Sequence, residues 1–295
     1  MAGKTREIAN RIKAVGNIQR ITKTMQMIAT ARFQAALRAA SASKPYTQQI
    51  ASLVAELSGA GQSVQHPLLG SDAKPAGRSL MLVLTSNRGL CGGYNGNVLR
   101  NAQAFLKQHK DPQTDIEVVG NKGRGYFNFT GREIAGFHEQ FGDKPRYEDV
   151  EALAEDYMQR FSSGQFDAVH IAYMSFQSVA RQTPTVLQLL PLEDPSAGEE
   201  QTASGKPTSN VNYEFSPAPG QLLNELLPIT VKTQLFQCFN DAVVSEQVAR
   251  MVAMKNATDA ASKMEQSLTR VYNRVRQTAI TTELMEVISG AAAIK

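Results

Sequence analysis

Glycine and proline, the residues that most often interrupt helices and strands, are distributed very unevenly along this chain of 295 residues. Between residues 4 and 58 they occur only as Gly16 and Pro45, and between residues 221 and 289 only as Pro228. The segment 59–220 holds almost all of the others. We therefore predict an N-terminal helix over 1–58, a linker over 59–78, an α/β domain over 79–215 with a mobile loop at 195–210, and a C-terminal helix over 216–295.

Both terminal stretches carry apolar residues at the spacing of a coiled-coil seam, which alternates steps of three and four. Ile18 would bridge a phase slip in the N-terminal helix. The predicted seams consist of Ile8, Ile12, Val15, Ile21, Met25 and Ile28 in the first helix, and of Ala257, Ala261, Met264, Leu268, Val271 and Val275 in the second.

The topology decides how these two helices can pair. They leave one middle domain at its two chain ends, so they can pack on each other only in antiparallel orientation. The C-terminal helix is the longer of the two, and we expect it to overhang its partner by about 20 Å.

The middle segment alternates apolar runs with helical patterns. We predict strands over 79–86, 115–120, 166–176 and 185–192, helices over 95–109, 122–129 and 147–163, and an edge strand at 211–215. This alternation is typical of a mainly parallel sheet with helices on its faces. The predicted fold class is α/β: a long antiparallel coiled coil of the N- and C-terminal helices, with a Rossmann-like domain inserted between them.

The segment 85–94 (TSNRGLCGGY) follows the first strand and could in principle cradle a phosphate. Its glycines, however, do not have the spacing of GxGxxG or of GxxxxGK[ST]. We therefore favour a tight turn over nucleotide binding. Cys91 and Cys238 are too far apart in sequence for a CxxC site, and the four histidines are scattered, so we expect no metal, no cofactor and no catalytic residue.

Charge is concentrated at the N-terminal end. Residues 1–44 hold nine Lys/Arg and one Glu, whereas residues 45–220 hold fourteen Lys/Arg and nineteen Asp/Glu. A helix with a net charge of +8 favours an acidic partner. One alternative is a nucleic-acid-binding helix, although Phe33 is the only aromatic residue in 1–44. Another is a nucleotide-dependent enzyme with a coiled-coil arm, which would hydrolyse ATP as an isolated chain.

Four segments in order carry a family resemblance. They are 18–32 (IQRITKTMQMIATAR), 88–93 (RGLCGG), 245–259 (SEQVARMVAMKNATD) and 276–291 (RQTAITTELMEVISGA). Across essentially its whole length the chain resembles the gamma subunits of F-type ATP synthases. The resemblance implies a central rotor shaft without catalytic activity of its own, which couples proton flow to ATP synthesis or hydrolysis.

The resemblance also implies roles for single residues. Met25 and Lys23 would face the acidic lever segment of the beta subunits. Tyr213 and Glu214 are weaker candidates for contact with the c-ring. The polar patch that holds the catalytic-subunit loops would consist of Arg250, Gln277, Thr281 and Glu283.

Each of these residues also has a plainer interpretation. Met25 could be an ordinary seam residue, and Arg250 a solvated charge. The implied partners are the alpha3-beta3 hexamer, the epsilon subunit and the c-ring, with no nucleic acid. Membrane association would be indirect, at the cytoplasmic face of a bacterial inner membrane, unless the chain is a mature organellar protein.

Overall fold

The structure of the chain is a computed structural model that describes residues 2–59, 66–70, 77–108, 113–142, 144–192 and 219–293. It divides into two compact units. The coil unit comprises Met1–Ala31 and Arg250–Lys295, and the α/β unit comprises Arg32–Ala249. Helix α1 (Ala2–Gly59) and helix α5 (Pro219–Ala293) each contribute to both units, which are described separately.

A five-stranded sheet forms the centre of the α/β unit, with the strand order β3-β2-β1-β4-β5. Strands β1 to β4 run parallel to their neighbours, and β5 runs antiparallel to β4. Strand β1 is almost continuously apolar because both of its faces are covered. The strands span Ser79–Leu84 (β1), Thr114–Val119 (β2), Gly136–His138 (β3), Ala168–Phe176 (β4) and Gln182–Leu190 (β5).

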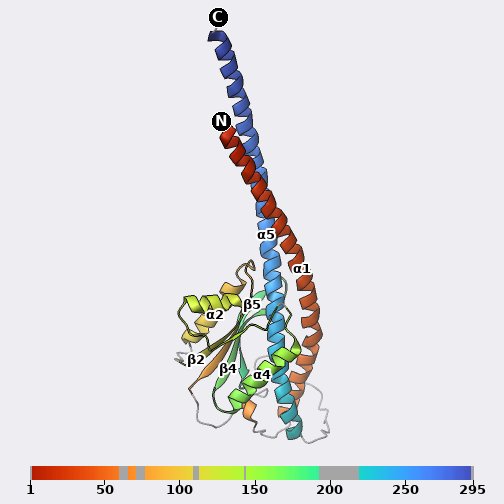
Figure 1. Ribbon diagram of the computed structural model, residues 1–295. Coiled ribbons are helices and arrows are strands. Elements are labelled where there is room, and N and C mark those ends of the chain that lie inside the picture. Colours follow the sequence, from red (N-terminus) through yellow and green to blue (C-terminus); the bar gives the residue numbers. More distant parts are fainter. Residues whose placement is uncertain are drawn as a thin grey trace. The chain divides into compact units, whose positions relative to one another are not determined.

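Helices cover both faces of this sheet, as Figure 1 shows. On one face, α2 (Tyr94–Gln108) and α3 (Asn121–Phe129) enclose a core with the β1 residues Met81 and Val83. On the other face, α4 (Tyr147–Ser162) shares a core with Leu80, Leu82 and Leu84 of β1 and with parts of α1 and α5. A short 3₁₀ turn, Pro67–Leu69, buries Leu68 in this second core. The predicted α/β layer is therefore confirmed.

The two terminal helices are long, as the sequence predicted. Helix α1 has 58 residues and α5 has 75. Pro45 and Pro228 both lie inside helices, so neither of them ends its helix. The predicted mobile loop at 195–210, the predicted edge strand at 211–215, Tyr213 and Glu214 lie outside the described residues.

Contacts within each unit show that α1 and α5 run antiparallel. In the coil unit, the Thr258 hydroxyl donates a hydrogen bond to Thr22 Oγ1 at 2.9 Å. In the α/β unit, the Ser43 hydroxyl donates to Gln237 Oε1 at 3.0 Å. From Thr22 to Ser43 the chain advances 21 residues, and from Thr258 to Gln237 it goes back 21. The same residue alignment of α1 against α5 therefore accounts for both hydrogen bonds.

The seam residues of the coil unit differ from the prediction. Ile21, Ile28, Met264 and Val271 are exposed, and no phase slip occurs at Ile18, which is also exposed. Two adjacent stripes of each helix carry the same three–four spacing, displaced by one residue, and periodicity alone cannot tell which of them faces the partner helix. The buried and half-buried seam consists of Ile8, Ile12, Val15, Gln19, Thr22, Gln26 and Ala29 in α1, and of Met254, Thr258, Ala261, Glu265, Leu268, Tyr272 and Val275 in α5.

Candidate contact surface

The coil unit has one apolar side. In an antiparallel coiled coil, the residues that precede the first seam position of each heptad lie on the same side in both helices. In the middle of the coil these residues, together with the outer neighbours Ile21 and Ile28 of α1, are apolar and form what we call the apolar flank, whereas Arg11 and Arg250 hold the same heptad position at its two ends. Its members are exposed or half-buried, and they are Ile18, Ile21, Met25 and Ile28 of α1 with Ala257, Met264 and Val271 of α5.

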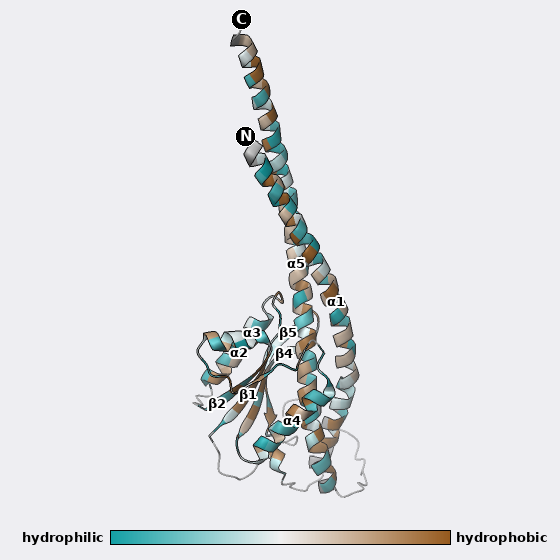
Figure 2. Ribbon diagram, viewed as in Figure 1, coloured by the Kyte–Doolittle hydropathy of each residue, from teal (hydrophilic) through white to brown (hydrophobic). Residues whose placement is uncertain are grey.

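The opposite side is mostly polar, and we call it the polar flank. It consists of Lys23 and Thr30 of α1 with Lys255, Ser262, Thr269 and Arg276 of α5. Met27 and Val252, which are both exposed, are apolar exceptions next to it. Figure 2 shows hydrophobic and hydrophilic residues side by side along both helices. The coil therefore offers two chemically different sides to whatever surrounds it.

The coil unit is also strongly basic. Its sequence segments 1–31 and 250–295 hold thirteen Lys/Arg and five Asp/Glu, a net charge of +8. Among its described residues, Arg11 forms an exposed ion pair with Glu7 at 2.8 Å within α1. An exposed pair of this kind contributes only about 0–1 kcal/mol. The excess of positive charge favours an acidic surface as the partner of the coil.

Met25 and Lys23 lie on different flanks of the coil. Met25 is half-buried on the apolar flank, whereas Lys23 is exposed on the polar flank. Two residues of α-helix correspond to about 200° of rotation, which accounts for their separation. A single partner segment would therefore contact one of them more closely than the other.

Arg250 is only 8% exposed, so it is not the solvated charge of the plainer interpretation. The register places it on the same side of the coil as Met25, about five residues further along the axis. Burial restricts the directions in which a guanidinium can donate hydrogen bonds. Arg250 is therefore a positioned cation.

Gln277, Thr281 and Glu283 lie near the C-terminal end of α5, about 40 to 50 Å along the helix from Arg250. All three are exposed, and the Thr281 hydroxyl donates to the Gln277 carbonyl oxygen at 3.0 Å. The structure thus separates the predicted polar patch into two locations.

The C-terminal end of α5 continues past the start of α1 (Figure 1). In the observed register Ala2 lies opposite residue 278, so about 20 Å of α5 extends beyond its partner, as predicted. This end exposes large apolar side chains, each more than half accessible: Leu284, Met285, Val287 and Ile288. Where the overhang begins, a surface pocket of about 340 Å³ is lined by residues that include Arg6, Tyr272, Arg276 and Glu283.

The N-terminus of α3 has no phosphate-binding geometry. The first three N–H groups of α3 already donate to the loop after β1: Asn121 to Asn87 Oδ1, Lys122 to the Ser86 carbonyl oxygen and Gly123 to Thr85 Oγ1. Gly120 has φ +94°, and a Cβ atom on it would lie 2.2 Å from the Thr85 carbonyl oxygen. The two loops interlock so closely that the helix N-terminus is not available to an anion.

Helix α5 covers the edge of the sheet at which open α/β folds usually bind ligands. At the carboxyl ends of β1 and β2, the space that remains is a cavity of about 30 Å³. Leu84 and Val119 line it from the strands, and Phe239, Ala242 and Glu246 line it from α5. A nucleotide does not fit into this volume.

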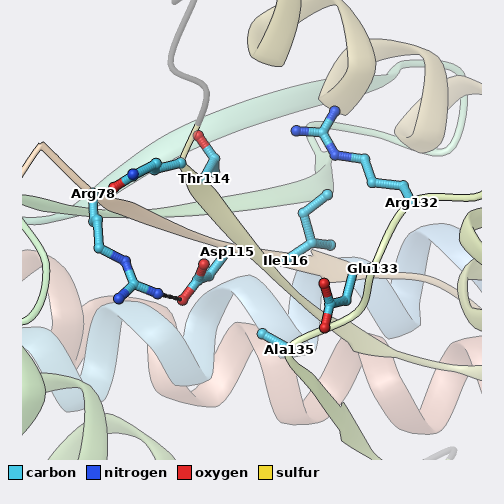
Figure 3. A pocket seen from close by; sticks show the side chains of 8 residues that line it. Arg78, Thr114, Asp115, Ile116, Arg132, Glu133 and Ala135 are labelled. Atoms are coloured by element: carbon cyan, nitrogen blue, oxygen red, sulfur yellow. Dashed lines mark hydrogen bonds and ion pairs between the residues drawn. The ribbon is translucent and has the colours of Figure 1, made fainter.

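The larger groove of the α/β unit lies at the opposite edge of the sheet and measures about 560 Å³ (Figure 3). Arg78 donates to Asp115 at 2.9 Å, while Arg132 and Glu133 lie apart from this pair. The charges in this groove do not converge on one point. In the described part of the chain, no group of three His, Cys, Asp or Glu side chains is placed to hold a metal ion.

A buried carboxylate lies on the α4 side of the sheet. Glu117 of β2 accepts hydrogen bonds from Tyr157 (2.7 Å) and Arg160 (2.8 Å). Its carboxylate also lies 2.7 Å from Nε2 of His138, in the edge strand β3. Burial of the carboxyl raises its pKa, but the contacts with His138, Arg160 and Tyr157 outweigh this effect and lower the pKa of Glu117 to about 2. The cluster ties β3 and α4 to β2 and is structural. The sequence pattern had not predicted either β3 or this cluster.

A family model described as ATP synthase matches residues 4–294. The ATP synthase gamma chain of Rhodopirellula baltica is 41% identical over 292 residues, which cover 98% of each chain. This chain belongs to the ATP synthase gamma chain family. The family's relative from Anaeromyxobacter is 38% identical over 300 residues, covering 98% of this chain and 99% of the relative.

Solved structures share the fold of the family. A chain in a cryo-EM structure of the Euglena gracilis mitochondrial ATP synthase (OSCP/F1/c-ring, rotational state 3) is 19% identical. It matches with a TM-score of 0.67 over 100% of this chain and 95% of the other. A second structure of that enzyme's rotor gives a TM-score of 0.63. In the described part of the chain, none of the helices combines the length and the apolar run needed to cross a membrane.

Proposed function

We propose that this chain is the central rotor shaft of an F-type ATP synthase. In this role it couples ion flow through the membrane sector to conformational cycling of three catalytic sites. The observation that carries the proposal, beyond family membership, is the coil unit with one apolar and one polar flank. The chain itself is non-catalytic in this account.

The two flanks give a physical reason for the coupling. Three identical catalytic sites placed around a shaft can differ only if the shaft shows each of them a different surface. Here one site would meet exposed isoleucine and methionine side chains, while another would meet lysine and arginine. Turning the shaft then exchanges these surfaces among the sites, because each state is stabilised only by its own contacts.

The proposed contacts follow from the positions on the coil. Arg250 and Met25 would contact the catalytic subunits from the side of the apolar flank, and Lys23 would pair with acidic groups from the polar flank. Near the end of α5, Gln277, Thr281 and Glu283 would hold the catalytic-subunit loops. The exposed apolar end of α5 suits a bearing, because an apolar sleeve would cover it without fixing its angle.

The proposed partners are an alpha3-beta3 hexamer around the coil unit, the epsilon subunit and the c-ring. The Euglena structure in rotational state 3 contains F1 and a c-ring, and we extend this arrangement to the present chain. Tyr213 and Glu214 remain candidates for the c-ring contact. The complex would lie at the cytoplasmic face of a bacterial inner membrane, with this chain as a peripheral subunit.

A pull-down of the tagged chain from membranes in mild detergent tests this assignment. Native mass spectrometry and an ATPase assay are applied to the eluate. We expect one copy of this chain with three nucleotide-binding heterodimers, and ATP hydrolysis by that species. Recovery of a monomer, or of a species that carries nucleic acid, would contradict the proposal.

A further inference from the structure

We propose that α5 is the helix that carries torque between the α/β unit and the coil, and that α1 mainly follows α5. This inference rests on the proposed rotor function and adds the load path to it. It comes from comparing how the two helices are held within the α/β unit. Both helices continue into the coil unit, so either of them could in principle transmit the load.

Apolar packing attaches α5 to the α/β unit over a long stretch. One side of α5 is buried in the core that contains α4 and the sheet. Close-packed interiors have low compressibility, so such a contact transmits strain. The α5 residues in this core are Leu223, Leu227, Val231, Leu235, Cys238, Phe239 and Ala242, each less than 7% exposed.

Directional contacts add to this packing on one side of α5. Lys232 Nζ donates to Glu151 and Glu155 of α4, at 2.8 and 2.6 Å. The Phe239 ring lies 4.5 Å from the ring of Phe141, centroid to centroid. Together these contacts fix α5 against α4 and against the segment that precedes it.

A second set of contacts holds the opposite side of α5. The Ser245 hydroxyl donates to the Met174 carbonyl oxygen at 3.2 Å, and the Phe176 N–H donates to Asp241 Oδ2 at 3.4 Å. At 3.6 residues per turn, Asp241 and Ser245 point roughly 180° away from Lys232. Contacts on opposite sides of a helix resist its rotation about its own axis, which is what torque transfer requires.

Helix α1 is held less extensively in the same unit. Of its described side chains, Ile50 and Val54 join the main core, and Phe33 and Ala40 form a smaller cluster with Val244 and Val248 of α5. Its Ser43 hydroxyl bonds to Gln237 of α5 rather than to the sheet. This arrangement makes α1 a helix clamped to α5.

Matched insertions at the boundaries between the units test the load path in the assembled complex. One variant receives Gly-Ser-Gly between Ala31 and Arg32 of α1, and the other receives it between Ala249 and Arg250 of α5. A probe attached to the α/β unit reports ATP-driven rotation and angular fluctuation in single molecules. We expect the α5 insertion to reduce torque and widen the fluctuation more than the α1 insertion does.

A milder pair of variants keeps the test valid if an insertion prevents assembly. Lys232→Met removes the ties to α4, and Ser43→Ala removes a contact of α1. We expect wider fluctuation only for Lys232→Met. Equal losses in both members of a pair, or a larger loss on the α1 side, would overturn the load path. A wild-type complex that hydrolyses ATP without turning the probe would contradict the rotor function itself.

Discussion

At the scale of single residues, Arg250 gives the sharpest test of a proposed contact. It is a cation at 8% exposure in a coil that is otherwise covered with solvated charges. We expect Arg250→Ala to leave the complex assembled and to lower its ATPase rate roughly tenfold, which corresponds to about 1.4 kcal/mol. The exposed Lys263, which belongs to neither flank, is the matched control, and Lys263→Ala should change the rate little. Unchanged rates in both variants would remove Arg250 from the proposed contacts.

Glu117 offers a prediction about pH at the same scale. Its pKa is about 2 in the folded chain against 4.5 as the ordinary value, so its contribution to stability is present above pH 4.5 and is lost as the pH falls toward 2. The shift corresponds to about 3 kcal/mol. Glu117→Gln should therefore lower the free energy of unfolding at pH 6, and the difference from wild type should shrink below pH 4.5.

Thermal unfolding of the purified chain across this pH range measures the effect. Glu139→Gln, at an exposed position outside the cluster, serves as the control and should track the wild type at every pH. A constant difference between wild type and Glu117→Gln down to pH 2 would show that the carboxylate charge is not what stabilises the cluster.

At the scale of elements, the seam of the coil can be checked by crosslinking. The hydroxyl oxygens of Thr22 and Thr258 are 2.9 Å apart, so cysteines at these two positions should form a disulfide within one chain under mild oxidation. In the control pair, cysteine replaces Ile21 instead of Thr22, and the second cysteine again stands at position 258. Ile21 is 60% exposed. More efficient crosslinking of the control pair would restore the seam that the apolar pattern had predicted.

The elements also show how far the sequence alone could lead. Sparse glycine and proline predicted both long helices, because helix continuity is a local property. The seam was partly wrong because Gln19, Thr22 and Gln26 occupy it while isoleucines lie outside it. The rule that apolar residues lie in the seam between two helices fails when the helix pair also presents apolar residues to a surrounding partner. The three-residue β3 gave no periodic signal at all.

At the scale of the whole molecule, the alternation of strands and helices predicted the α/β layer. The pairing order β3-β2-β1-β4-β5 and the burial of Glu117 depend on contacts between distant segments, which no local pattern contains. The contact residues came from the family resemblance, whereas the division of the coil into two flanks emerged only with the register of α1 against α5. In the proposed function, the surface that each catalytic site meets depends on that register more than on any single motif.

Rotation of single complexes tests the central claim most directly. The complex is fixed to a surface through its catalytic hexamer, a probe is attached to the α/β unit of this chain, and ATP is supplied. A rotor shaft predicts that the probe turns in one direction with three stops per revolution, one for each catalytic site. Undiminished ATP hydrolysis with a stationary or randomly fluctuating probe would contradict the account.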